Sequence, residues 1–188
     1  MKIAHLFAVG ALGLGLGLAA CEKPAPPEPA PASKEDAQAC YRQRNYRCAA
    51  LNYYGYLKLY PTESDTRAIY AISLTKSGQH RLAIQQYEQV LKEGVGTYDL
   101  FASYATSLDA LGRTEDSMTW NRKTLELVPN LVDVRGTLAQ QLVRQGKHDE
   151  AIKLLQDFDA YLKKNGSSPY FEGQIMVIKE ARAARAAG

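Results

Sequence analysis

Apolar and small residues recur along most of the chain at a constant spacing of 34 positions. Gly78, Gly112 and Gly146 show this spacing, and each lies between two apolar stretches of helical periodicity. The same step relates Tyr70 to Tyr104 and Leu138, Ala71 to Ala105 and Ala139, Leu74 to Leu108 and Leu142, and Ala83 to Ser117 and Ala151. A glycine that follows one helix and precedes the next is typical of a tight turn between helices. The pattern therefore predicts a series of helix–turn–helix repeats.

The spacing divides the C-terminal part of the chain into three regular repeats, over residues 64–97, 98–131 and 132–165. A degenerate repeat precedes them, with Ala49, Tyr53, Tyr56 and Pro61 in its second helix, but Arg44 and Asn45 stand where its turn glycine belongs. After Pro169, residues 170–186 predict one more helix, alanine-rich and with charges on one face. We expect a solenoid over residues 36–165 and a capping helix within residues 166–188.

The period and the residue types resemble the tetratricopeptide repeat (TPR) over residues 36–186. The resemblance implies an all-α protein, a short right-handed solenoid of about four helical hairpins closed by a C-terminal cap helix. Two positions depart from the pattern of the family. Ser117 replaces the usual alanine, and Asn121 stands where an aromatic residue is expected. The helix packing at these two positions is expected to differ.

The N-terminus has the layout of an exported lipoprotein. Lys2 precedes an apolar run over residues 3–20, as in a secretory signal peptide. A transmembrane helix is the alternative, but the run contains four glycines and no basic cluster follows it. Leu18, Ala19, Ala20 and Cys21 resemble the bacterial lipobox. That resemblance implies cleavage after residue 20 and a membrane anchor of acyl chains on Cys21.

Residues 21–35 join this anchor to the solenoid. The segment contains five prolines among alanines and charged residues, which predicts an extended spacer. Glu22 follows the cysteine, whereas the sorting rule of such lipoproteins uses aspartate to retain them in the inner membrane. The expected location is therefore the periplasmic face of a bacterial outer membrane.

Composition and charge exclude several classes of function. The chain has 23 Lys and Arg residues against 20 Asp and Glu residues, and this near-neutral mixture argues against binding of nucleic acid. Three histidines and three cysteines leave little material for a metal site or a catalytic pair. His80 and His148 occupy the same repeat position, which favours a packing role over catalysis. We expect no enzyme, no metal and no cofactor.

Cys40 and Cys48 belong to the two helices of the first hairpin in the TPR alignment. The helices of one hairpin face each other, so a disulfide bond is feasible there, and an exported protein meets an oxidising compartment. A reactive redox pair and two buried thiols are the alternatives. A disulfide would pin the repeat that lacks its turn glycine.

In the TPR family the first helices of the hairpins line the concave face, where protein partners bind. Cytosolic relatives hold a terminal carboxylate with Lys and Asn columns, which here contain Ala68, Ala102, Thr106 and Gln140. That clamp is therefore absent. The residues that we expect to contact a partner are Tyr41, Arg42, Asp65, Ile72, Lys76, Asp99, Thr106, Asp109, Gln140 and Arg144.

Tyrosine is abundant, with 12 residues in the chain. Tyr53, Tyr56 and Tyr87 occupy core columns of the second helices, whereas Tyr54 and Tyr60 flank them and are candidates for an exposed interface. Together these features predict a lipid-anchored TPR scaffold that binds another envelope protein, with a role in pilus, secretin or cell-wall assembly. The alternative is a structural envelope spacer that has no specific ligand.

Overall fold

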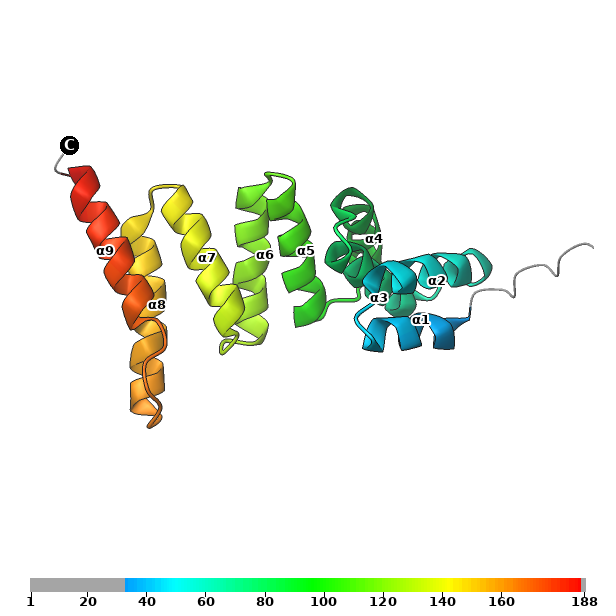
Figure 1. Ribbon diagram of the computed structural model, residues 1–188, viewed down its shortest axis with the longest axis horizontal. Helices are drawn as coiled ribbons and strands as arrows, with labels where there is room; N and C mark the ends of the chain where they lie inside the picture. Colours follow the sequence, from blue (N-terminus) through cyan, green and yellow to red (C-terminus); the bar gives the residue numbers. More distant parts are fainter. Residues whose placement is uncertain (1–32, 187–188) are drawn as a thin grey trace, which may run out of the picture. The chain divides into compact units, whose positions relative to one another are not determined.

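The computed structural model describes residues 33–186, and within this range all regular secondary structure is helical (Figure 1). The helices are α1 (Lys34–Arg42), α2 (Tyr46–Leu59), α3 (Ser64–Lys76), α4 (His80–Lys92), α5 (Tyr98–Ala110), α6 (Thr114–Leu127), α7 (Val132–Arg144), α8 (His148–Lys164) and α9 (Glu172–Ala186). Each helix packs against the next in the chain, and α3 also packs against α5. The predicted series of helical hairpins is confirmed, with α1–α2, α3–α4, α5–α6 and α7–α8 as the four hairpins.

The four hairpin turns share one backbone geometry. Gly78, Gly112 and Gly146 have φ angles of 81°, 77° and 76°, and the next residue donates its backbone N–H to the carbonyl four residues before that glycine. Arg44 occupies the equivalent place in the first turn with a φ of 58°, and Asn45 N donates to Cys40 O over 2.9 Å. A side chain is disfavoured at such an angle, so the first turn keeps the fold of the others at a local cost.

Small residues allow the two helices of each hairpin to approach closely. Ala49, Ala83, Ser117 and Ala151 lie 34 residues apart, and all four are completely buried. The leucine column of the first helices, Leu74, Leu108 and Leu142, is also buried. The repeat columns read from the sequence are therefore the packing positions of the solenoid.

Two hydrophobic clusters form the interior. The first extends through α1–α5 and contains Tyr53, Tyr70, Tyr87 and Tyr104. The second extends through α6–α9 and is mainly aliphatic, with Met118 and Leu155 completely buried. Each hairpin therefore buries its apolar face against its neighbours, as expected for a solenoid.

The C-terminal helix is attached by a buried carboxylate. Asp159 of α8 is 5% exposed, and its oxygens accept the backbone N–H groups of Tyr170 and Phe171 at 2.8–3.1 Å. The ring of Phe171 is buried and lies 5.9 Å from that of Phe158. These contacts hold the start of α9 over the second cluster, in the position of a cap.

Helix α1 begins at Lys34, inside the segment that the sequence predicts as spacer. Ser33 caps it by accepting the backbone N–H of Asp36 over 3.0 Å, and the acidic residues Glu35 and Asp36 lie in its first turn. The predicted signal peptide (1–20), the lipidation site Cys21 and the spacer up to residue 32 lie outside the described residues. Within residues 33–186, no helix is long and apolar enough to cross a membrane.

Candidate protein-binding site

Five of the predicted partner-binding residues line one hollow on the face formed by α1, α3, α5 and α7, here called the first-helix face. Tyr41 and Arg42 reach it from α1, Asp65 and Ile72 from α3, and Asp99 from α5, and its volume is about 390 Å³. Ile72 is buried and Tyr41 is half-buried, whereas Arg42, Asp65 and Asp99 are exposed. The hollow therefore combines an apolar floor with a charged rim, as a pocket for one or two partner side chains requires.

The charges on the rim of this hollow are available to a partner. Among the described residues, none of Arg42, Asp65 and Asp99 has an ion-pair partner within 4.0 Å. Burial raises the pKa of Tyr41 above its ordinary value of 10.0, and the nearby Tyr46 and Asp99 raise it further. Tyr41 is therefore a neutral hydrogen-bonding group at physiological pH, beside two free carboxylates and one free guanidinium.

Lys76 lies near the hollow, because it contacts the ring of Tyr46, which in turn contacts Tyr41. Its ammonium group lies 5.3 Å from the ring centroid of Tyr46, and that ring is 5.5 Å from the ring of Tyr41 in an edge-to-face arrangement. The cation–π contact holds the charge near the hollow without neutralising it. Lys76 thus extends the site from α3 toward the first hairpin turn.

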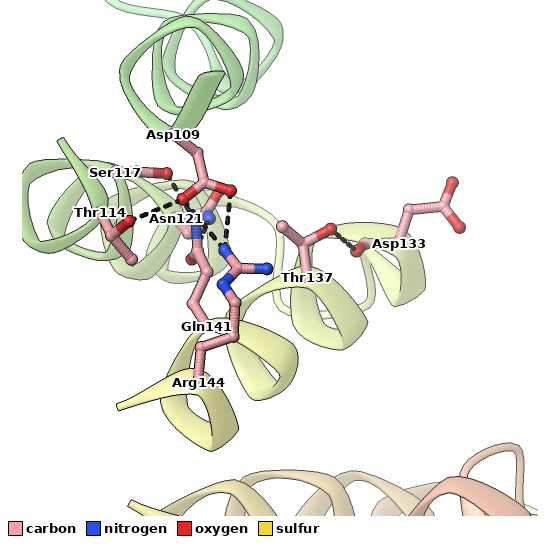
Figure 2. A network of polar contacts seen from close by, with 8 residues as sticks. All are labelled: Asp109, Thr114, Ser117, Asn121, Asp133, Thr137, Gln141 and Arg144. Atoms are coloured by element: carbon pink, nitrogen blue, oxygen red, sulfur yellow. Dashed lines mark hydrogen bonds and ion pairs between the residues drawn. The ribbon is translucent and has the colours of Figure 1, made fainter. Parts of the chain in front are cut away.

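The other predicted residues form a separate group toward the C-terminus. Arg144 of α7 donates two hydrogen bonds to Asp109 of α5, at 3.0 and 2.8 Å, and Thr114 donates a third over 3.1 Å (Figure 2). Thr106 and Gln140 are exposed, and the Thr106 hydroxyl donates to the carbonyl of Ala102 within its own helix. Asp109 and Arg144 are therefore paired with each other and join α5 to α7.

A buried amide network lies beneath this ion pair. The side chain of Asn121 donates to Gln141 over 2.9 Å, and Gln141 donates in turn to Ser117 over 2.8 Å (Figure 2). All three residues are buried. The two departures from the family pattern, Ser117 and Asn121, are thus explained together, since Gln141 of the next hairpin satisfies both. The sequence analysis did not identify Gln141 as their partner.

A large groove lies on the opposite face, formed by α2, α4, α6 and α8 and here called the second-helix face. Helices α2 and α4 wall this groove, here called the α2–α4 groove, and its volume is about 1010 Å³. Leu51, Tyr54 and Leu82 line it and are 71%, 48% and 46% exposed. Tyr54 was predicted from the sequence as an interface residue, but the groove around it was not predicted. The available signal was Leu51 and Leu82, which are apolar where the third and fourth repeats have Thr119 and Glu150.

The structure brings Cys40 of α1 and Cys48 of α2 together across the first hairpin turn. Their sulfur atoms lie 2.04 Å apart, at disulfide distance, and their Cα atoms are 5.7 Å apart. Arg44, with its strained backbone, lies between them. A bond at this place constrains the one turn, among the four hairpin turns, that lacks glycine.

His80 and His148 both have neighbours that hold them in place. His148 is buried, and its Nδ1 lies 2.9 Å from the carbonyl oxygen of Gly146. His80 is half-buried, with Nδ1 3.3 Å from the Ser107 hydroxyl. In the part of the chain that the structure describes, no group of three His, Cys, Asp or Glu side chains is arranged to hold a metal ion.

No protein-family model matches the chain, and no curated protein matches its sequence. Solved structures do match. YrrB, described as a TPR protein with an unusual peptide-binding site, is 20% identical with a TM-score of 0.57, over 64% of this chain and 62% of YrrB. A MamA protein is 14% identical with a TM-score of 0.63, over 81% of this chain and 84% of MamA. MamA from Desulfovibrio magneticus RS-1 is 17% identical with a TM-score of 0.59, over 78% and 73%.

The chain therefore has the fold of a TPR protein, as the repeat pattern predicts. It spans less than two thirds of the length of YrrB. At these levels of identity the similarity extends to the fold alone, and the function has to be argued from the surfaces of this chain.

Proposed function

We propose that this protein is a lipid-anchored TPR scaffold of a Gram-negative cell envelope, which binds a segment of another envelope protein on its first-helix face. The observation that carries the proposal is the hollow around Ile72, with its unpaired charges on Arg42, Asp65 and Asp99. An apolar side chain of the partner fills the hollow, while its charged neighbours pair with the rim. The peptide-binding site named for YrrB supports this use of the fold.

The location rests on the N-terminal sequence. Leu18, Ala19, Ala20 and Cys21 match the lipobox, and the proline-rich spacer gives the solenoid reach from the membrane surface. Disulfide distance between Cys40 and Cys48 agrees with an oxidising compartment. The partner then belongs to pilus, secretin or cell-wall machinery, and the protein serves by holding it at the membrane.

The test is photo-crosslinking in living cells with a photoreactive residue at Asp99, followed by mass spectrometry of the captured proteins. Asp133, the exposed repeat counterpart of Asp99 outside the hollow, is the matched control position. The expected result is one dominant partner at Asp99 that is absent at Asp133. This capture should weaken with Tyr41→Ala/Lys76→Glu and be lost with Cys21→Ala.

Equal capture of abundant envelope proteins at both positions contradicts the scaffold. If a variant that consists of the anchor and the spacer, without the solenoid, restores function, the protein is instead a structural envelope spacer. Helicity measured by circular dichroism confirms that the variants remain folded.

A further inference from the structure

The α2–α4 groove contains an ordered stripe of side chains that the proposed function does not use. Arg47, Leu51, Tyr54 and Lys58 lie on α2 at spacings of 4, 3 and 4 residues, so they share one side of that helix. Leu51 and Tyr54 thus stand at the centre of the stripe, with Arg47 before them and Lys58 after them, and the Lys58 ammonium lies 4.5 Å from the ring centroid of Tyr54. The stripe covers three turns, or about 16 Å along the helix.

Apart from Arg67, the other wall and the floor of the groove are apolar or neutral. Leu82 faces the stripe from α4, and the buried residues Leu57, Tyr70 and Leu74 form the floor. Among the described residues, the charged ones that line the groove are Arg47, Lys58 and Arg67, and none of the lining residues is a carboxylate. Arg67 is buried and donates to the Pro61 carbonyl and to Gln86, so it belongs to the structure. Arg47 and Lys58 remain, with no ion-pair partner among residues 33–186.

The equivalent groove two repeats later, between α6 and α8, differs from the α2–α4 groove in size and in charge. The groove between α6 and α8 has a volume of only about 440 Å³. Arg122 and Glu150 form an ion pair of 2.8 Å between its walls, at the positions of Tyr54 and Leu82 in the first groove. Its other acidic lining residues are Glu126 and Asp157. The α2–α4 groove is therefore larger, apolar and positively charged, whereas its repeat counterpart is smaller, bridged by an ion pair and mixed in charge.

These features specify an occupant. We propose that the α2–α4 groove binds an amphipathic helix of a partner protein, with two central apolar residues and a carboxylate beyond each, at spacings of 4, 3 and 4. The apolar pair packs against Leu51, Tyr54 and Leu82, and the carboxylates pair with Arg47 and Lys58. A membrane surface is disfavoured because a flat bilayer does not reach the floor of a groove, whereas protruding side chains do. This site is independent of the first-helix face.

The probe is a synthetic helical peptide of about 18 residues with Glu, Leu, Leu and Glu at those spacings, labelled for fluorescence anisotropy. The protein is the full chain in nanodiscs that contain phosphatidylglycerol. Tyr54→Arg/Leu82→Glu copies the ion pair of the α6–α8 groove onto two exposed positions, and it should weaken binding at least about tenfold. The matched control, Arg122→Ala/Glu150→Ala, should leave the affinity within about twofold of the parent.

Charge reversal tests the role of the two cations. Arg47→Glu/Lys58→Glu should weaken the Glu peptide by about tenfold or more and favour a peptide with Lys at the two outer positions. Tyr41→Ala, on the first-helix face, should not change the affinity for the peptide. If the parent captures no dominant partner at Asp99 in cells but binds the peptide as described here, the proposed function alone is rejected.

A photoreactive residue at Leu51, with Thr119 as its repeat counterpart and control, identifies the occupant directly. Crosslinks from Leu51 to the peptide support the proposal. Crosslinks from Leu51 to lipid or to a second copy of the chain overturn it. Equal binding of the peptide by the parent and by Tyr54→Arg/Leu82→Glu, both with native helicity, also overturns it.

Discussion

Helices α1–α5 and helices α6–α9 fill the same repeat positions with different side chains. We call α1–α5 the first half and α6–α9 the second half. In the first half Tyr53 and Tyr87 occupy the core column of the second helices, whereas Asn121 takes that position in α6. In the facing column of the first helices, Ser73 and Ser107 are replaced by Gln141. The first half therefore combines a large tyrosine ring with a small serine side chain, whereas the second half combines the short amide side chain of Asn121 with the longer one of Gln141. A large-and-small pair is thus replaced by two residues of intermediate size, and the interaction changes from aromatic packing to hydrogen bonding.

The polar groups of the two halves are satisfied in different ways. In the first half the Tyr87 hydroxyl lies 2.8 Å from Thr75, which lies 2.8 Å from Ser107. In the second half Gln141 bridges Asn121 and Ser117 with its own amide. The contrast teaches that aligned positions of a repeat protein are not interchangeable one at a time, because each residue is matched to its neighbour in the next hairpin.

The largest expected effect is the loss of a core tyrosine. Tyr87→Ala removes a completely buried ring and should lower the free energy of unfolding by about 3–5 kcal/mol. Asn121→Ala leaves an acceptor of Gln141 unpaired and should cost about 1–3 kcal/mol. Urea denaturation followed by circular dichroism measures both. Tyr87→Phe, which keeps the ring, should cost only about 0.5–1.5 kcal/mol. Equal losses for the two alanine variants would remove the distinction between the halves.

The second effect concerns the first hairpin turn. Cys40→Ser/Cys48→Ser removes a bond with a sequence separation of 8 residues and should lower stability by about 2–3 kcal/mol. Differential scanning calorimetry of the parent with and without reductant should show the same shift, and the double variant should not respond to reductant. A parent that is insensitive to reductant would show that the bond does not stabilise the first half.

The other three turns provide a control for this variant. Each has glycine where the first turn has Arg44 at a φ of 58°. Arg44→Gly should therefore recover about 1 kcal/mol in the background without cysteines, because the strain of a side chain at this angle is removed. A further loss of stability instead would mean that the arginine side chain, and not the backbone angle, matters in this turn.

The third effect tests whether the second half accepts the arrangement of the first. Asn121→Tyr alone places a ring against Gln141 and should cost about 1–3 kcal/mol through overpacking. Adding Gln141→Ser restores the large-and-small pair of the first half and should return about 1–2 kcal/mol of that loss. Urea denaturation of both single variants and the double variant gives the coupling energy. Strictly additive losses would show that the two columns are independent.

The fold could be predicted from the sequence because residues at fixed positions of each repeat identify its turn and its buried helix faces. Gly78, Gly112 and Gly146 mark hairpin turns that require a positive φ angle, and the alanine and leucine columns mark the buried faces of the helices. A spacing of this kind can be recognised in the sequence without knowledge of the residues that each position contacts in the folded chain. The same logic placed Tyr53 and Tyr87 in the core and Tyr54 and Tyr60 at the surface, as the structure confirms. It also placed Tyr56 in the core, which is wrong, because Tyr56 is only partly buried and its hydroxyl donates to Glu63.

Pairwise contacts between hairpins could not be predicted in this way. Spacing places Asp109 and Arg144 on one face, but only the distance between α5 and α7 shows that they neutralise each other. Asp159 stands in the column of Leu57, Leu91 and Leu125, and this break was a readable signal for a buried polar contact. Its partners, the N–H groups at the start of α9, belong to the backbone and have no sequence signature.

The smallest effect is an acid response that belongs to the first half alone. Glu63 accepts hydrogen bonds from Lys34, Tyr56 and Thr66, each at 2.6 Å. These bonds lower the pKa of Glu63 from its ordinary value of 4.5 to about 2, with the bond from Lys34 as the largest cause. The equivalent positions of the next two repeats are Thr97 and Leu131, which carry no charge.

Because the folded state prefers the ionised carboxylate, the stabilisation from Glu63 is complete above pH 4.5 and is lost as the pH falls toward about 2. The melting temperature of Glu63→Gln should therefore approach that of the parent as the pH is lowered through this window, and lie below it at neutral pH. Parallel curves for the two proteins would contradict the shifted pKa. Since Lys34 is the first residue of α1, the acid-induced change should begin with the loss of α1. Hydrogen exchange should then quicken in α1 before it quickens in α6–α9, which would separate the two halves by their pH response as well as by their cores.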